Sequence, residues 1–108
     1  MSTPPELSVE ERLAALAKAA EVRRSRAELK ERLKMGSLSL EELLETAKSD
    51  EVAARTKVLA VLESLPGVGK VKARRAMEEI GIAESRRVRG LGPQQRQALL
   101  DMFPPSFR

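Results

Sequence analysis

Residues 65–73 read Leu65-Pro66-Gly67-Val68-Gly69-Lys70-Val71-Lys72-Ala73 and join two helical patterns through a turn short enough to require a tight hairpin. Pro66 lacks an N–H and disfavours helical backbone in the residue before it, so the first helix should end there. Gly67 and Gly69 flank one apolar residue, which permits positive φ and a close approach of the backbone to a ligand. The next helix should begin near Lys70, so its unpaired N–H groups, its positive dipole end and the Lys70 ammonium converge. Together these features predict a phosphate site.

Two other interpretations of this stretch use the same glycines. The simpler one is a plain helix–helix turn, because glycine pairs are common in turns. A nucleotide-binding P-loop would need glycine where Ser64 stands, Ser or Thr where Val71 stands, and a strand before the loop, so that interpretation fails. The pattern instead resembles the helix-hairpin-helix family of nucleic-acid binders, whose apolar-x-Gly-apolar-Gly turn contacts a phosphate backbone.

Composition limits the fold and the chemistry. At 108 residues the chain makes one small domain, and its two Phe, with no Tyr or Trp, imply an aliphatic core. The scarcity of aromatic residues also removes the stacking platform of sequence-specific single-strand binders. Without Cys or His there is no disulfide, no thiolate zinc site and no histidine base. We therefore expect no enzymatic activity, no metal and no cofactor.

The charges are basic overall and unevenly distributed. Twenty Lys and Arg face sixteen Asp and Glu, and the net charge of +4 favours a polyanionic partner. Basic side chains are concentrated in residues 18–34 and 64–96, with an acidic block in residues 35–63 between them. No apolar run is long enough to span a membrane, and the first residues lack the order of a signal peptide. We expect a cytoplasmic monomer without membrane contact.

A long helix is predicted from Ser8 to Met35. Ser8 and Glu11 have the spacing of a capping box, and Gly36 supplies the left-handed terminator. At about 100° per residue the apolar stripe changes sides along this helix. We expect the end carrying Leu29 and Leu33 to dock on the globular part, while the end carrying Leu13 projects.

The same helix carries a cationic stripe that is a candidate for contact with a phosphate backbone. Its members share one side of the helix and are Arg23, Arg26, Lys30 and Lys34. A solvated helix face with i,i+4 charge pairs is the simpler interpretation. The functional interpretation is a second surface that follows a phosphate backbone.

The rest of the chain also predicts helices, so the fold class is all-α: a long N-terminal helix followed by a small domain of about four helices. Local signals place these helices at residues 40–47, 51–65, 70–80 and from Pro93 onward, with Leu99, Leu100, Met102 and Phe103 facing inward. Ser39 and Glu42 form a second capping box, and Gly81 ends the third of these helices. The expected segments are residues 1–36, a tail and the long basic helix; 37–103, the globular domain; and 104–108, a C-terminal tail.

A run of arginines precedes a second glycine-bounded turn. Arg86, Arg87 and Arg89 lie just before Gly90-Leu91-Gly92 and should repel one another unless an anion is near. An exposed charge cluster is the simpler alternative. We expect these arginines and the hairpin to form one compact patch that contacts an anionic ligand, and we expect removal of the three arginines to leave folding intact.

Three stretches, residues 23–30, 65–73 and 86–92, resemble the actinobacterial (mycobacterial-type) integration host factor family, and the resemblance extends over residues 14–100. It implies a long N-terminal helix followed by a helix-two-turns-helix domain, a fold unrelated to the αβ heterodimeric integration host factor. The implied function is that of a nucleoid-associated protein that binds duplex DNA with little sequence preference, bends and condenses it, and assists site-specific recombination. Double-stranded DNA and recombinase–DNA complexes are the implied partners.

The resemblance assigns DNA contacts position by position. The residues carried over are Pro66, Gly67, Gly69, Lys70, Lys72, Arg86, Arg87 and Arg89. The alternative function is an RNA-binding or ribosome-associated helical domain that uses the same hairpin on an RNA backbone. The missing aromatics argue against recognition of single strands but do not separate duplex DNA from duplex RNA.

Overall fold

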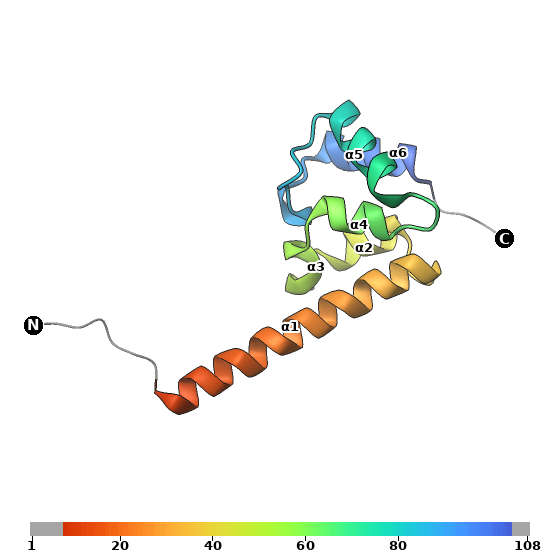
Figure 1. Ribbon diagram of the computed structural model, residues 1–108. Coiled ribbons are helices and arrows are strands. Elements are labelled where there is room, and N and C mark those ends of the chain that lie inside the picture. Colours follow the sequence, from red (N-terminus) through yellow and green to blue (C-terminus); the bar gives the residue numbers. More distant parts are fainter. Residues whose placement is uncertain (1–7, 105–108) are drawn as a thin grey trace, which may run out of the picture.

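The computed structural model describes residues 8–104, and the regular elements within that range are all helical (Figure 1). The elements are α1 (Val9–Met35), α2 (Leu40–Thr46), α3 (Glu51–Arg55), α4 (Val58–Ser64), α5 (Gly69–Ile80), the 3-10 helix η1 (Val88–Gly90) and α6 (Pro93–Met102). This confirms the all-α prediction with its long N-terminal helix. Residues 1–7, and residues 105–108 of the predicted C-terminal tail 104–108, lie outside the described residues.

The two halves of α1 have different surroundings. The helix starts at the predicted capping box, in which the Ser8 hydroxyl accepts the Glu11 N–H at 3.0 Å and the Glu11 carboxylate accepts the Ser8 N–H at 3.2 Å. Near the other end Leu33 is 1% exposed, whereas Leu13 and Leu16 remain 61% and 65% exposed. The second half therefore docks and the first half projects, as expected (Figure 1).

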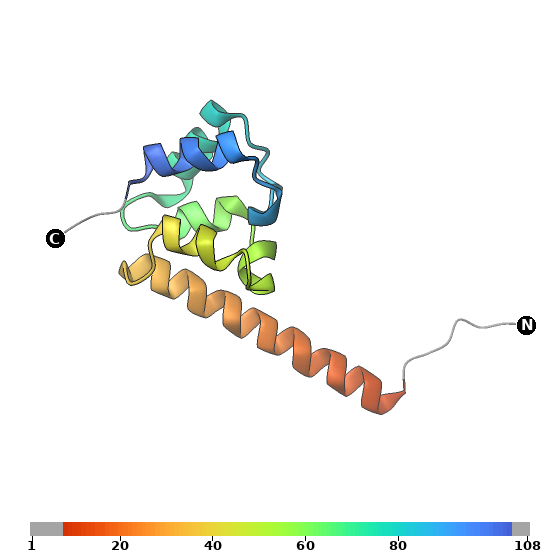
Figure 2. The ribbon, with the colours of Figure 1, turned by 180° about the vertical axis from the view of Figure 1, so that it is seen from behind.

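The globular part is built from the remaining helices around an aliphatic core. Helices α4 and α5 face the viewer in Figure 1, while α2 and α6 face the viewer from behind in Figure 2, and α1 runs beneath them in both views. The most buried large side chains come from five different helices and are Leu33, Leu43, Leu62, Met77 and Leu99. On the surface, a 2.8 Å ion pair between Glu45 and Arg96 joins α2 to α6.

The helix predicted over residues 51–65 is wrong in one respect, because it is two helices with a break between them. Helix α3 ends before Thr56, whose backbone is extended (φ −69°, ψ 140°), and α4 starts at Val58. Two backbone groups that would bond within a continuous helix instead form hydrogen bonds with the distant segment around Arg86. Thr56 C=O accepts the Val88 N–H at 3.0 Å, and Val58 N–H donates to Arg86 C=O at 2.9 Å. Tertiary hydrogen bonds thus override the helical pattern at this point.

The last helix follows its sequence signals at its start but not at its end. Pro93 occupies its first turn, as predicted. Leu99 is buried and Phe103 packs on the core, but Met102 is 39% exposed and does not face inward. Within α6 the side chains that pack on the core are Leu99 and Leu100, and Phe103 follows the end of the helix. Within residues 8–104 no helix is both long enough and apolar enough to cross a bilayer.

Candidate nucleic-acid interface

The hairpin between α4 and α5 has the backbone that its glycines predict. Leu65 is extended (ψ 143°), and both Gly67 (φ 74°) and Gly69 (φ 69°) are left-handed. A Cβ built on either glycine meets no described atom within 4 Å. The glycines are therefore needed for the backbone conformation and not for space. The first N–H groups of α5, which have no partner within their own helix, follow this turn directly.

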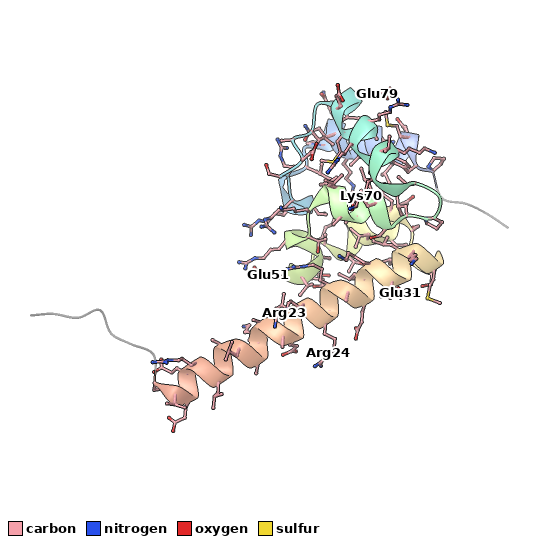
Figure 3. All side chains as sticks on the ribbon, in the orientation of Figure 1. Arg23, Arg24, Glu31, Glu51, Lys70 and Glu79 are labelled. Carbon is pink, nitrogen blue, oxygen red and sulfur yellow. The ribbon has the colours of Figure 1, made fainter. Side chains whose placement is uncertain are left out.

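The start of α5 has an electrostatic arrangement opposite to that of α1 and α2. Those two helices begin with capping boxes and glutamates, which favour the positive end of a helix dipole. Helix α5 begins after Val68, which provides no side-chain cap hydrogen bond within the described residues, and its first turn carries Lys70 and Lys72. Both lysines are exposed, and Figure 3 shows Lys70 at the α4–α5 side of the domain. Cations at a positive helix end are unfavourable alone and favourable around an anion.

The three arginines of the second turn have three different environments. Arg86 is half-buried, and its Nη1 donates to Gly90 C=O at 2.9 Å and to Gln95 Oε1 at 3.0 Å. Arg87 is exposed, and its Nη1 donates to Arg55 C=O at the end of α3. Arg89 has no hydrogen bond or ion pair to any residue between 8 and 104. Because two of the three bind backbone carbonyls, the expectation that their joint removal would leave folding intact is no longer supported.

A cleft of about 340 Å³ lies between α1, the α3–α4 break and the second turn, and we call it the cationic groove. It is lined by Arg26, Lys30, Arg55, Thr56, Lys57, Ala60 and Arg87, and none of these residues is acidic. Sequence reasoning singled out Arg26, Lys30 and Arg87 but missed Arg55 and Lys57. These two flank the break at Thr56, and a sequence that predicts one unbroken helix gives no signal for them.

The charges of the cationic groove are brought together by the backbone and are poorly neutralised. Lys57 and Arg87 form an isolated antiparallel bridge of the non-hydrogen-bonded type, flanked by the two hydrogen bonds that break the helix. Residues in such a pair lie about 4.5 Å apart at Cα with side chains on the same face, and like charges placed so are destabilising. Arg26 Nε is buried and has no hydrogen-bond partner among residues 8–104. Only Arg55 among the lining cations has an ion pair within the described residues, with Glu51 at 2.9 Å. A bound anion would relieve this excess of positive charge.

The predicted contact surfaces are arranged differently from the expected single patch. Figures 1 and 2 show the hairpin loop and the second turn at opposite edges of the globular part, with α4 between them. The seven residues of α4 span about 10 Å. The second turn instead faces the same cleft as α1, because Arg87 lines the groove together with Arg26 and Lys30 of the cationic stripe.

The other two members of the cationic stripe, Arg23 and Lys34, do not line the groove. Both are exposed, and Figure 3 shows Arg23 on the side of α1 nearer the globular part while Arg24 points away. The stripe thus divides into a groove-lining pair and an outer pair.

Comparison with known proteins matches residues 33–103 to the S13-like H2TH domain family. The chain is 58% identical over 99 residues to the integration host factor of Mycobacterium tuberculosis, a match that covers 92% of this chain and 94% of that protein. The chain belongs to the integration host factor family. Within this family it is also 56% identical to the Mycolicibacterium smegmatis protein and 54% identical to the Streptomyces coelicolor protein. These matches cover 94% and 92% of the chain, and 97% and 92% of those proteins.

A solved structure confirms the fold of this family member. It is described as sIHF bound to an 8bp palindromic DNA, and it matches with a TM-score of 0.78 and 53% identity over 81% of this chain and 98% of that one. The resemblance drawn from residues 23–30, 65–73 and 86–92 is thereby confirmed. Among the described residues no cluster of three or more acidic, His or Cys side chains could hold a metal ion.

Proposed function

We propose that the protein is an architectural DNA-binding protein of the nucleoid that contacts duplex DNA through its phosphates with little sequence preference. The observation that carries the proposal is the cationic groove, whose lining holds five cations, no acid and a buried unpartnered Arg26 Nε. The relative bound to an 8bp DNA supports duplex DNA as the anion. Bending, condensation and assistance to site-specific recombination, including contact with recombinase–DNA complexes, belong to the same proposal.

Two contact points serve this function. At the hairpin, Lys70, Lys72 and the backbone around Pro66, Gly67 and Gly69 present N–H groups and charge to one phosphate, as helix N-termini do. At the cationic groove, Arg26, Lys30, Lys57 and Arg87 follow the phosphate backbone. Helix α6 carries Gln and Arg side chains of the kind that read base edges in the major groove. Gln95, Arg96 and Gln97 are already engaged with Arg86, Glu45 and Asp101, so this helix presents no free recognition surface of that kind. Affinity without specificity is the consequence, because phosphates carry no sequence information.

Salt titration on several duplexes tests the proposal. Each neutralised phosphate contributes about −0.9 to the slope of log K against log salt. We expect similar affinities among unrelated duplexes and a steep slope that becomes shallower by about one in Lys57→Gln. Lys48→Gln is the matched control, because Lys48 is exposed, does not line the groove and is paired with Glu45 at 3.0 Å. A flat slope in the wild type, or a preference of several orders of magnitude for one sequence, would contradict the proposal.

Binding to duplex RNA is the second candidate function. The hairpin and the cationic groove serve it equally well, because an RNA backbone presents the same phosphate charge. Duplex RNA differs in its deep, narrow major groove and its 2′-hydroxyls, which change the spacing of phosphates across a groove. Competition decides between the two: duplex RNA of matched sequence should displace bound duplex DNA poorly. Displacement at equal concentration would favour RNA.

A further inference from the structure

Arg86 differs from Arg87 and Arg89, because its side chain is hydrogen-bonded to residues of the second turn and of the start of α6. We propose that Arg86 is a positioning residue of the DNA interface: its guanidinium fixes the second turn so that Arg87 and Arg89 face the phosphates. This inference rests on the proposed function and deepens it. It separates the run into one residue that shapes the surface and two that touch the ligand.

The guanidinium of Arg86 closes the turn on itself. Its Nη1 donates to Gly90 C=O at 2.9 Å and to Gln95 Oε1 at 3.0 Å. The same Gln95 oxygen also accepts the Gly92 N–H at 3.2 Å. One side-chain oxygen on α6 thus connects Arg86 to the far end of the turn. Both hydrogens of Nη1 have protein acceptors, so this nitrogen is already engaged before DNA arrives.

The aliphatic part of Arg86 occupies space that Gly90 leaves open. A Cβ at residue 90 would lie 2.9 Å from Arg86 Cδ, closer than real Cβ contacts allow. Gly90 is not among the positive-φ glycines, so a larger residue there would displace the Arg86 side chain and would not strain the backbone. The turn is therefore shaped around the Arg86 side chain.

The backbone of Arg86 transmits this placement to the cationic groove. Its carbonyl accepts the Val58 N–H at 2.9 Å, which anchors the turn on the start of α4. The next residue, Arg87, then lies opposite Lys57 in the groove. Loss of the guanidinium should let residues 86–92 sample other conformations. The apparent affinity for DNA would then fall in proportion to the fraction of molecules whose second turn has the binding-competent conformation.

Salt-dependent binding separates positioning from phosphate contact. We expect Arg86→Ala and Arg86→Lys each to lower duplex affinity at least fivefold with an unchanged salt slope, because the bound complex still neutralises the same phosphates. Arg87→Ala should instead make the slope shallower by about one. Gln95→Ala should reproduce most of the Arg86→Ala loss. The double variant should bind within twofold of Arg86→Ala alone, because both changes remove the same link.

Hydrogen exchange in the free protein gives a measure that does not depend on DNA. The Gly92 amide should exchange faster in Arg86→Lys and Gln95→Ala than in the wild type. Arg89→Ala is the matched control and should leave that amide unchanged, because Arg89 has no partner among residues 8–104. If Arg86→Ala is too unstable to measure, Arg86→Lys and Gln95→Ala still carry the test.

Three results would overturn the inference. A salt slope shallower by one in Arg86→Ala, a wild-type affinity in Gln95→Ala, or unchanged Gly92 exchange in Arg86→Lys would each make Arg86 a direct ligand or a spectator. A failure of the proposed function looks different, because the wild type itself would then show no salt-dependent binding to duplexes. In that case the exchange data alone would assign Arg86 to the turn, without a role in an interface.

Discussion

Two glycines give the hairpin a backbone conformation that other residues adopt only at a cost. Gly69 has φ 69° and open space where a Cβ would lie, so its replacement strains the backbone without a clash. We predict that Gly69→Ala lowers the free energy of unfolding by about 1 kcal/mol and weakens duplex binding beyond that loss, because the amides at the start of α5 move. Chemical denaturation and binding measured side by side check this.

Gly81 provides the matched control for that prediction. It has φ 86° and the same open surroundings, but it ends α5 at the end remote from the hairpin. Gly81→Ala should therefore show a similar stability loss with wild-type affinity. Equal affinity in both variants would mean that the hairpin backbone takes no part in binding.

A carboxylate on the surface gives the protein a small pH dependence at the residue scale. Hydrogen bonds from Lys48 and from Arg96 hold the pKa of Glu45 below its ordinary value. A folded-state pKa that is lowered adds stability above the unfolded-state pKa, and this stability disappears as the pH falls through the folded-state value. We predict that Glu45→Gln slightly lowers Tm at neutral pH and that the difference vanishes in acid. Thermal melts of both proteins from pH 7 to pH 3 check this, and a difference that persists at low pH would contradict it.

The two halves of α1 should respond differently to the loss of a leucine side chain. Leu33 is 1% exposed, so Leu33→Ala leaves a cavity and should cost about 2–5 kcal/mol. Leu16 is 65% exposed, and Leu16→Ala should change the free energy of unfolding by less than about 0.5 kcal/mol. Urea denaturation measures both. A large loss in Leu16→Ala would show that the projecting half is covered in solution.

The docked half of α1 carries an arginine that should lower the stability of the free protein and strengthen its binding to DNA. Arg26 Nε is buried and finds no partner in the part of the chain that the structure describes, and such a donor is unfavourable in the folded state. We predict that Arg26→Met keeps or raises Tm and lowers duplex affinity. Arg23→Met is the control, because Arg23 lies on the same helix outside the groove and should change affinity less. A Tm drop of several degrees in Arg26→Met would instead assign Arg26 to the fold.

Most elements could be predicted because their ends depend on neighbouring residues. The capping boxes at Ser8 and Ser39 and the terminators at Gly36 and Gly81 all act within one turn of helix. The break at Thr56 could not be predicted in this way, since its hydrogen bonds come from Arg86 and Val88, far along the chain. The cationic groove shares that origin, because the break is what brings Lys57 opposite Arg87. The role of Arg86 was hidden for the same reason, as its side-chain acceptors become neighbours only in the folded turn.

The molecule as a whole is elongated because half of α1 stands outside the globular part. Its extents are 59 × 30 × 25 Å and its radius of gyration is 16.9 Å, whereas a compact chain of this length would have about 13 Å. The groove lies where α1 meets the globular part, and the hairpin lies across α4 from it. A duplex that touches both sites therefore has to run across the surface between them.

This separation of sites leads to a prediction about bending. Duplex DNA has a persistence length of about 150 bp, so curving a short site costs on the order of 1–6 kcal/mol. Phosphate contacts in the groove can offset that cost, whereas the hairpin alone has little reason to deform the duplex. We predict that changing Arg26 and Lys30 to Glu reduces ligase-mediated circularisation of short DNA more than it reduces occupancy.

The outer pair of the cationic stripe is the matched control for bending. Changing Arg23 and Lys34 to Glu reverses the same number of charges on the same helix but leaves the groove lining intact. At protein concentrations that give equal occupancy, this variant should circularise DNA nearly as well as the wild type, and the groove variant should not. If both variants match the wild type, α1 is a solvated helix face, and any bending belongs to the hairpin and second turn. If both variants circularise DNA equally poorly, bending depends on the overall charge of α1 and not on the groove. The outer-pair variant keeps the groove lining, so its loss of circularisation could not be assigned to the groove.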